Sequence, residues 1–324
     1  MIEVKNLTKC YGKHLAVDNL SFTVQEGQIY GFLGPNGAGK STTMNIMTGY
    51  LGATKGEVLI NGHDILKEPE EAKSCIGYLP EQPPLYMEMT VLEYLTFAAE
   101  LKKIPKAERE SQILRVMRLT KLDPVKERLI HNLSKGYKQR VGLAQAILGF
   151  PEIIILDEPT VCLDPKQIIE IRELIRTLAK KHTVILSSHI LAEIREVCDH
   201  IMIIAGGHLV ASDTLENLMS GTGHVALETK ASKEQMEVVL KSVPEISSVK
   251  YEETDEHTTL AYIESKDGTD LREKLFYTFA DARIPLLTLR LNKSSLEDIF
   301  LELTQGGKKQ KEAEKKLAGK EDQK

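Results

Sequence analysis

Short apolar segments alternate with helical segments over residues 1–222 of the chain. The apolar segments have the length and the β-branched content of buried strands. We predict strands at residues 2–4, 20–24, 28–33, 57–60, 153–156, 183–187 and 200–205. Because strands that alternate with helices are typical of α/β proteins, we predict an α/β domain over residues 1–222.

The alternation stops between about residues 85 and 150, where helical periodicity replaces it. A helix is predicted to begin at Thr90, because Glu93 completes a T-x-x-E capping box. Leu92, Leu95 and Ala99 then fall on one side of that helix. We therefore predict a helical subdomain inserted into the α/β domain.

The pattern changes again after residue 222. Strands are expected at residues 224–229, 247–251, 258–264 and 285–291, and helices at residues 233–242 and 270–280. The order β-α-β-β-α-β is that of a ferredoxin-like fold, so we predict a small α+β accessory domain over residues 223–304. It ends in an amphipathic helix at residues 294–303. The lysine-rich tail, residues 305–324, is predicted to be disordered, with contact to anionic lipids as the alternative.

Composition excludes several classes of protein. A chain of 324 residues suits two domains, and its net charge of −5 gives no sign of a basic face, so no nucleic acid is expected as a partner. The four cysteines lie far apart, which favours reduced thiols over a disulfide framework or a zinc site. The first residues carry no apolar signal sequence, and no apolar run reaches the ~20 residues that cross a bilayer. Any role at a membrane is therefore expected to depend on a partner.

Residues 34–42 read GPNGAGKST, which fits the phosphate-loop pattern G-x-x-x-x-G-K-[ST]. Its fixed places are filled by Gly34, Gly39, Lys40 and Ser41. The segment before it is strand-like and the segment after it can form a helix, which is the context that the motif requires. A glycine-rich turn that matches by chance is the alternative, and a dinucleotide fold has the different spacing G-x-G-x-x-G.

Glycines let the backbone wrap closely around phosphates, and the N–H groups at the start of the helix point at the anion. Lys40 adds a full positive charge near the β- and γ-phosphates, and the Ser41 hydroxyl can bind Mg²⁺. The rest of the loop completes the predicted nucleotide site with Asn36, Gly37, Ala38 and Thr42.

Two carboxylates, Asp157 and Glu158, end the apolar run at residues 153–156. Asp157 is predicted to hold Mg²⁺ directly or through water, and Glu158 to take a proton from the attacking water. The alternative for this pair is an ordinary acidic strand end. The phosphate loop upstream makes the catalytic interpretation the stronger one.

A second candidate anion site precedes these carboxylates. Ser134 is predicted to cap the helix that follows it, and a helix N-terminus that carries a serine and Gly136 can bind an anion. A plain helix cap is the alternative interpretation.

These motifs, in this order, resemble the ATP-binding subunits of ABC transporters, and the resemblance covers the first 220 residues or so. Residues 133–137, LSKGY, are similar to the family signature LSGGQ, with Lys135 in place of a glycine and Tyr137 in place of glutamine. The resemblance implies that Tyr11 stacks on adenine and that His189 contacts the γ-phosphate. A surface tyrosine and a core or surface histidine are the alternatives.

The family's Q-loop corresponds to residues 77–86, GYLPEQPPLY. Aligning Gly-Tyr-Leu-Pro puts Glu81 at the glutamine position, with Gln82 next to it. Either side chain has an oxygen that could face Mg²⁺ or the water, so both are candidates. Asp164 resembles the family's D-loop aspartate, which communicates across the dimer.

Residues 78–86 and 294–304 are similar to ATPases that serve ABC-2-type permeases, which are often exporters. The resemblance implies Mg²⁺-dependent ATP hydrolysis, two nucleotide-binding domains that sandwich two ATP molecules, as a homodimer or with a close paralogue, and a membrane permease as partner. It also implies a cytoplasmic protein held at the inner face of the membrane by that permease.

Three other functions compete with this one. The ATPase of a binding-protein-dependent importer often carries a β-barrel regulator, unlike the order predicted for residues 223–304. A soluble ABC protein of translation or DNA maintenance usually has two nucleotide domains in one chain or a long coiled coil. A non-hydrolysing nucleotide-binding module is disfavoured by Glu158 and His189.

Overall fold

The computed structural model describes residues 1–324 except 162, 221–222, 254–257, 267–268, 294–299 and 301–324. The chain divides into two compact units, Met1–Asp213 and Thr214–Gln305. The domain limits drawn from the sequence stay a prediction. Cys162, the tail and all of the expected helix at residues 294–303 but Phe300 lie outside the described residues.

A six-stranded sheet forms the centre of the first unit, in the order β10-β9-β3-β8-β7-β6. Neighbours from β9 to β6 pair in parallel. Parallel strands buried on both faces read as continuous apolar runs, which is why β3 and β7 are buried along their whole length. The strands are β3 (Ile29–Leu33), β6 (Ile76–Leu79), β7 (Ile153–Leu156), β8 (Thr183–Ser188), β9 (His200–Ala205) and β10 (His208–Thr214).

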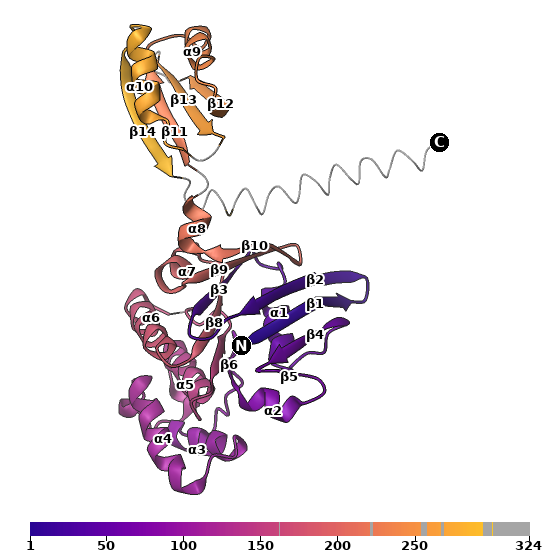
Figure 1. Ribbon diagram of the computed structural model, residues 1–324. Helices are drawn as coiled ribbons and strands as arrows, with labels where there is room; N and C mark the ends of the chain where they lie inside the picture. Colours follow the sequence, from indigo (N-terminus) through magenta and orange to yellow (C-terminus); the bar gives the residue numbers. More distant parts are fainter. Residues whose placement is uncertain (162, 221–222, 254–257, 267–268, 294–299, 301–324) are drawn as a thin grey trace. The chain divides into compact units, whose positions relative to one another are not determined.

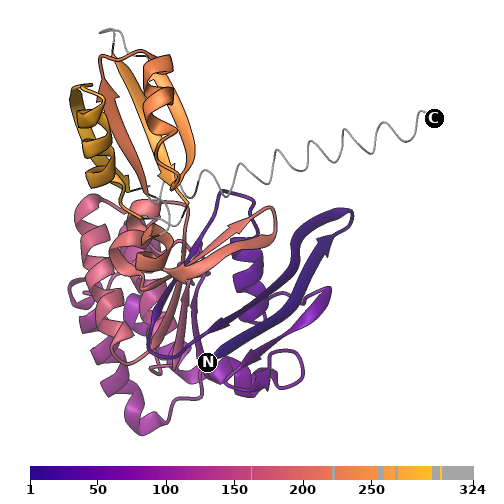
Figure 2. The same ribbon diagram turned by 45° about the horizontal axis from the view of Figure 1, so that its top comes forward.

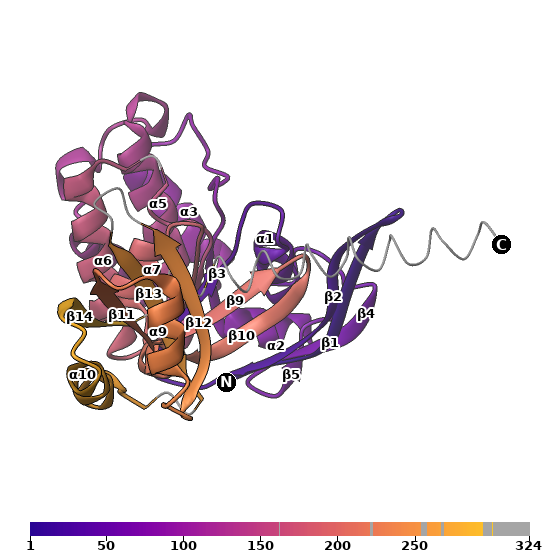
Figure 3. The ribbon, with the colours of Figure 1, turned by 90° about the horizontal axis from the view of Figure 1, so that it is seen from above.

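A second, antiparallel sheet has the order β2-β1-β4-β5. Its strands are β1 (Ile2–Tyr11), β2 (His14–Val24), β4 (Lys55–Ile60) and β5 (His63–Asp64). Helix α1 (Lys40–Met47) lies between the two sheets (Figures 1 and 3). Met44, Ile46 and Met47 are buried there in one cluster with side chains of both sheets, so the helix that follows the phosphate loop is fixed on two sides.

Helices α5 (Lys135–Ile147), α6 (Pro165–Ala179) and α7 (Leu191–Val197) cover the other face of the central sheet (Figure 1). Gly31 in β3 explains how closely α7 approaches. A Cβ added there would lie 2.8 Å from both Cys198 Sγ and Ile194 Cγ2, so a side chain at this position would push the helix away. Helix α2 (Pro69–Ser74) connects β5 to β6.

The predicted helical block consists of α3 (Val91–Leu101), α4 (Lys106–Leu119) and two short 3₁₀ segments, Asp123–Val125 and Ile130–Asn132, and it packs on α5 (Figure 2). The capping box is confirmed: Glu93 N donates to Thr90 Oγ1 at 3.2 Å, and Thr90 N donates to Glu93 Oε2 at 2.8 Å. In the described part of the chain, no helix is long and apolar enough to cross a bilayer.

Lys102 joins the ends of α3 and α5. Its ammonium donates to the carbonyl oxygens of Gln145 at 2.7 Å, Ala146 at 3.1 Å and Leu148 at 2.7 Å. A lysine at the C-terminal end of a helix satisfies carbonyls that have no partner within the helix. Burial lowers the pKa of Lys102 to about 8.

The second unit begins with α8 (Leu215–Ser220) and then follows the order β-α-β-β-α-β. Its antiparallel sheet has the order β12-β13-β11-β14, and Leu227, Met236, Ile263, Leu275 and Phe279 lie in its core. The elements are β11 (Gly223–Thr229), α9 (Lys233–Leu240), β12 (Ile246–Glu253), β13 (Thr259–Ser265), α10 (Arg272–Asp281) and β14 (Leu286–Lys293). The ferredoxin-like assignment of this unit stays a prediction.

Candidate functional site

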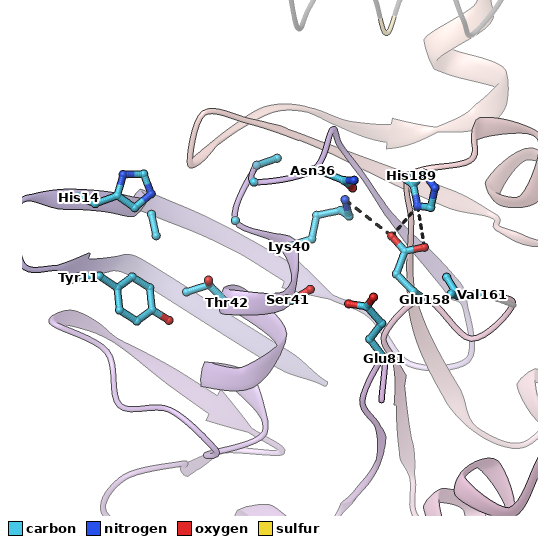
Figure 4. A pocket seen from close by; sticks show the side chains of 14 residues that line it. Tyr11, His14, Asn36, Lys40, Ser41, Thr42, Glu81, Glu158, Val161 and His189 are labelled. Carbon is cyan, nitrogen blue, oxygen red and sulfur yellow. Dashed lines mark hydrogen bonds and ion pairs between the residues drawn. The ribbon is translucent and has the colours of Figure 1, made fainter. Parts of the chain in front are cut away.

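A cavity of about 480 Å³ opens over the N-terminus of α1 (Figure 4). It brings together most of the candidates predicted from the sequence: Tyr11, Asn36, Gly37, Ala38, Gly39, Lys40, Ser41, Thr42, Glu81, Glu158 and His189. These residues come from β1, the phosphate loop, the segment after β6 and the ends of β7 and β8. In a parallel sheet the carboxyl ends of the strands meet at one edge, which explains how the phosphate loop, Glu81, Glu158 and His189 reach one cavity. Tyr11 reaches it from β1 of the antiparallel sheet.

Glycine is required at two positions of the loop. Gly39 has φ +105°, and a Cβ added to it would lie 2.7 Å from Ala16 O; a Cβ added to Gly34 would lie 2.4 Å from Ile204 O. The loop therefore packs directly on neighbouring backbone. Helix α1 begins at Lys40, so its first N–H groups have no partner inside the helix and are available to an anion. This cradle fits the phosphates of a nucleotide.

Lys40 is buried, with 6% of its surface exposed. Its Nζ donates to Gly34 O at 2.6 Å and lies 3.9 Å from Glu158 Oε1. Burial lowers the pKa of Lys40, while the carboxylates of Glu158, Asp157 and Glu81 act in the opposite direction. The amine therefore lies beside the loop and faces the acidic side of the cavity (Figure 4).

Glu158 and His189 are in direct contact. His189 Nδ1 lies 3.1 Å from Glu158 Oε1 and 3.0 Å from Oε2 (Figure 4). The backbone of Glu158 has φ +49°, a conformation that costs energy for a residue with a side chain and that is found preferentially at functional sites. Ser187 Oγ fixes this turn, because it accepts from Glu158 N at 2.9 Å and donates to Asp157 Oδ1 at 2.5 Å.

The predicted metal ligands lie together at a neighbouring cavity of about 620 Å³. Ser41, Glu81, Gln82 and Asp157 all line it, and Ser41 and Glu81 also line the first cavity. In the part of the chain that the structure describes, no cluster of three or more His, Cys, Asp or Glu side chains could hold a metal ion. The oxygen donors of Ser41, Glu81, Gln82 and Asp157 fit Mg²⁺, which is usually bound by one or two carboxylates together with substrate phosphates.

Ser134 and Gly136 are not part of either cavity. They lie at the start of α5, where Ser134 Oγ accepts from Tyr137 N at 3.4 Å and caps the helix. A Cβ added to Gly136 would lie 2.3 Å from Gln167 Oε1 on α6, so this glycine allows two helices to approach each other. Within one chain, the signature segment is separate from the phosphate loop.

Three further residues line the first cavity and were missed in the sequence: His14, Ala16 and Val161. His14 lies beside Tyr11 across the turn between β1 and β2, so the turn Tyr11-Gly12-Lys13-His14 was the available signal. Ala16 supplies a backbone carbonyl next to Gly39, and no side-chain pattern indicates such a contact.

Comparison with known proteins supports the same interpretation. The family model described as ABC transporter matches residues 17–161. Over 309 residues, which are 95% of this chain and 98% of the relative, the chain is 36% identical to the bacitracin transport ATP-binding protein BcrA of Bacillus licheniformis. It is 32% identical to the linearmycin resistance ATP-binding protein LnrL of Bacillus subtilis over 310 residues, 94% of this chain and 98% of that protein.

Solved structures agree with the fold. The structure of an ATP-binding subunit of an ABC transporter superposes with a TM-score of 0.63 at 33% identity, covering 67% of this chain and 91% of that one. A dimeric post-hydrolysis state of the ATP-binding cassette MJ0796, bound to ADP and Pi, gives a TM-score of 0.62 at 28% identity and covers 66% and 99%. The chain belongs to the ABC transporter family, as an ATP-binding subunit that hydrolyses ATP.

Proposed function

We propose that two copies of this chain, or one copy and a close paralogue, bind two ATP molecules between them and drive export through an ABC-2-type membrane permease. The observation that carries the proposal is the cavity shared by the phosphate loop, Glu158 and His189. The names of BcrA and LnrL, one a bacitracin transport protein and the other a linearmycin resistance protein, favour export. The chain would then work in the cytoplasm, held at the inner face of the membrane by the permease.

In the proposed site, the loop amides and Lys40 hold the β- and γ-phosphates. Ser41, Asp157 and either Glu81 or Gln82 would hold Mg²⁺, and the bound ion would offset the negative charge of the phosphates. Glu158 accepts a proton from the attacking water, and His189, in contact with Glu158, lies beside the γ-phosphate. Tyr11 stacks on the adenine ring.

The second chain completes each site. Because Ser134 and Gly136 lie outside the cavity of their own chain, we infer that they bind the γ-phosphate of the ATP held by the other chain. ATP then binds the closed pair better than the open one and shifts the equilibrium toward it. Hydrolysis removes that preference and the pair reopens.

We place the permease contact on the helical block. Tyr86 is 55% exposed, and its ring centroid lies 5.3 Å from that of Phe97 and 6.3 Å from that of Tyr94. With Leu85, these rings line a third cavity of about 480 Å³, next to the loop that carries Glu81 and Gln82. A largely apolar groove beside the nucleotide site suits a segment of a membrane subunit, because its occupant would sense the motion of that loop.

Tyr86→Asp is expected to release the protein from membranes that contain its permease, with binding weakened ~10-fold or more, because a charge would enter the centre of an apolar contact. Basal ATPase activity should stay near the wild-type value, since no predicted phosphate contact is changed. Leu66→Asp is the control, because Leu66 is equally exposed at 58% but does not line this cavity. Membrane fractionation, ATPase assays and melting curves on both variants make the comparison.

Two outcomes would count against this proposal. Loss of ATPase activity and a lower melting temperature in Tyr86→Asp would mean that the ring packs inside the helical block. A wild-type protein that stays in the soluble fraction with each candidate permease, and that binds ribosomes or DNA, would contradict the transporter function itself.

Tyr11→Ala is expected to raise the KM for ATP ~10-fold and to leave kcat close to normal, because stacking of a base on an aromatic ring contributes ~1–3 kcal/mol to binding. Tyr11 is 47% exposed, so its loss should not destabilise the fold. Tyr11→Phe keeps the ring and should behave like the wild type. An unchanged KM in Tyr11→Ala would mean that Tyr11 is a surface tyrosine that does not stack on adenine.

A further inference from the structure

A buried carboxylate lies behind the proposed catalytic pair. Glu193, on α7, is 5% exposed. Its Oε2 accepts from Thr160 Oγ1 at 2.6 Å and from Ser188 Oγ at 3.0 Å. In the part of the chain that the structure describes, no lysine, arginine or histidine forms an ion pair with Glu193. Burying a carboxylate costs free energy, so a role is needed that explains the burial of Glu193.

The two hydroxyl donors lie in the segments that carry Glu158 and His189. Thr160 follows Glu158 by two residues, and Ser188 immediately precedes His189. Both hydroxyl-bearing residues are buried, Thr160 at 7% and Ser188 at 1% exposure. Ser188 Oγ also accepts from Ile190 N at 3.0 Å, so its contacts span the backbone on both sides of His189. One carboxylate oxygen therefore ties together the segments that carry Glu158 and His189.

We propose that Glu193 is a positioning residue for ATP hydrolysis, which sets the contact between Glu158 and His189 without touching the nucleotide. The inference rests on the proposed roles of those two residues. Ser187 holds the N-terminal side of the Glu158 turn, and the bond from Thr160 to Glu193 holds its C-terminal side. Glu158 has φ +49°, so its turn needs support on both sides to keep the carboxylate aimed at His189.

The first test separates binding from turnover. Glu193→Ala should bind ATP with nearly the wild-type Kd, because the phosphate loop is intact, while kcat falls ~10²-fold as the pair loses its alignment. Glu193→Gln keeps an amide oxygen that can accept both hydroxyl hydrogens, so it should recover most of the lost kcat. Thr160→Val and Ser188→Ala, which remove one donor each, should lower kcat in the same direction and provide the test if Glu193→Ala does not fold.

The second test asks whether Glu193 acts through His189. If it does, adding Glu193→Ala to His189→Ala should lower kcat little further, since the contact it aligns is already gone. Glu170→Ala is the matched control: it removes the partner of Arg140, whose Nη2 lies 2.5 Å from Glu170 Oε2, and should lower the melting temperature. Its effect on kcat should multiply with that of His189→Ala.

The inference is overturned if the effects of Glu193→Ala and His189→Ala on kcat multiply. It is also overturned if the kcat of Glu193→Gln is no higher than that of Glu193→Ala. It is also overturned if Glu193→Ala turns over normally while Glu158→Gln is impaired. Normal turnover in Glu158→Gln is a different result, which would overturn the proposed roles of the catalytic pair and with them the role of Glu193.

Discussion

Glu158→Gln is expected to bind ATP like the wild type but to hydrolyse it ~10²–10⁴-fold more slowly, because the amide cannot accept the proton of the attacking water. The substitution keeps the size of the side chain. It leaves Asp157 and its bond from Ser187 in place, so Mg²⁺ binding should survive. Single-turnover measurements with excess protein would report the loss directly.

The same variant should collect as an ATP-bound dimer, because the closed pair forms but is not reopened by hydrolysis. Gel filtration or light scattering with and without ATP would detect the change in mass. Glu173→Gln, which changes an exposed glutamate on α6, is the control and should stay active. Turnover close to normal in Glu158→Gln would mean that Glu158 is not the catalytic base.

Lys40→Ala is the second variant with a large expected effect: it should abolish hydrolysis and ATP binding at concentrations that saturate the wild type. The Lys40 side chain is buried beside the loop, so its interaction with a phosphate is little screened by solvent. In a melting experiment, ATP raises the transition temperature of a protein that binds it. Wild type should show this shift and Lys40→Ala should not.

Two comparisons make that result specific. Without nucleotide, Lys40→Ala should melt close to the wild type, which excludes misfolding as the cause. Lys13→Ala changes an exposed lysine in the neighbouring β1–β2 turn and should keep the ATP-dependent shift. If Lys40→Ala bound and hydrolysed ATP normally, the phosphate-loop assignment would be wrong.

The phosphate loop and four strands of the central sheet, β3, β7, β8 and β9, could be predicted because the information is local, whereas β6 (Ile76–Leu79) and β10 (His208–Thr214) were not predicted. A fully apolar run such as residues 153–156 predicts a buried strand by itself, and strand, glycine loop and helix follow one another within residues 28–47. The capping box at Thr90 is likewise contained in four residues, and the structure confirms it.

The antiparallel sheet of the first unit, with the order β2-β1-β4-β5, was predicted only in part. The sequence indicated strands at residues 2–4 and 20–24, whereas β1 runs through Ile2–Tyr11 and β2 through His14–Val24. The register between them shifts several times, and Asn6 and Asn19 have φ +49° and +48°. Such bulged strands lose the simple alternation of apolar and polar residues from which a strand is predicted.

The candidate site shows the same limit. The motifs identified Glu158 and His189 separately, but not that the two side chains touch, nor that Glu158 adopts a positive φ. The contact of Thr160 with Glu193 joins residues that are 33 positions apart, and neither residue has a distinctive sequence pattern around it. Contacts of this kind depend on how β7 and β8 pair, which becomes known only with the folded chain.

The contacts of Lys102 with the C-terminal end of α5 affect how far the N-terminal end of that helix moves when it tilts. Helix α5 has 13 residues and is therefore about 20 Å long. Its C-terminal end is held to α3 by the three carbonyl contacts of Lys102, and its N-terminal end carries Ser134. A tilt of about 10° around the anchored end carries the far end through about 3.5 Å, the length of one long hydrogen bond. If Ser134 binds a phosphate of the other chain, as proposed above, a step of this size would be enough to make or break that contact.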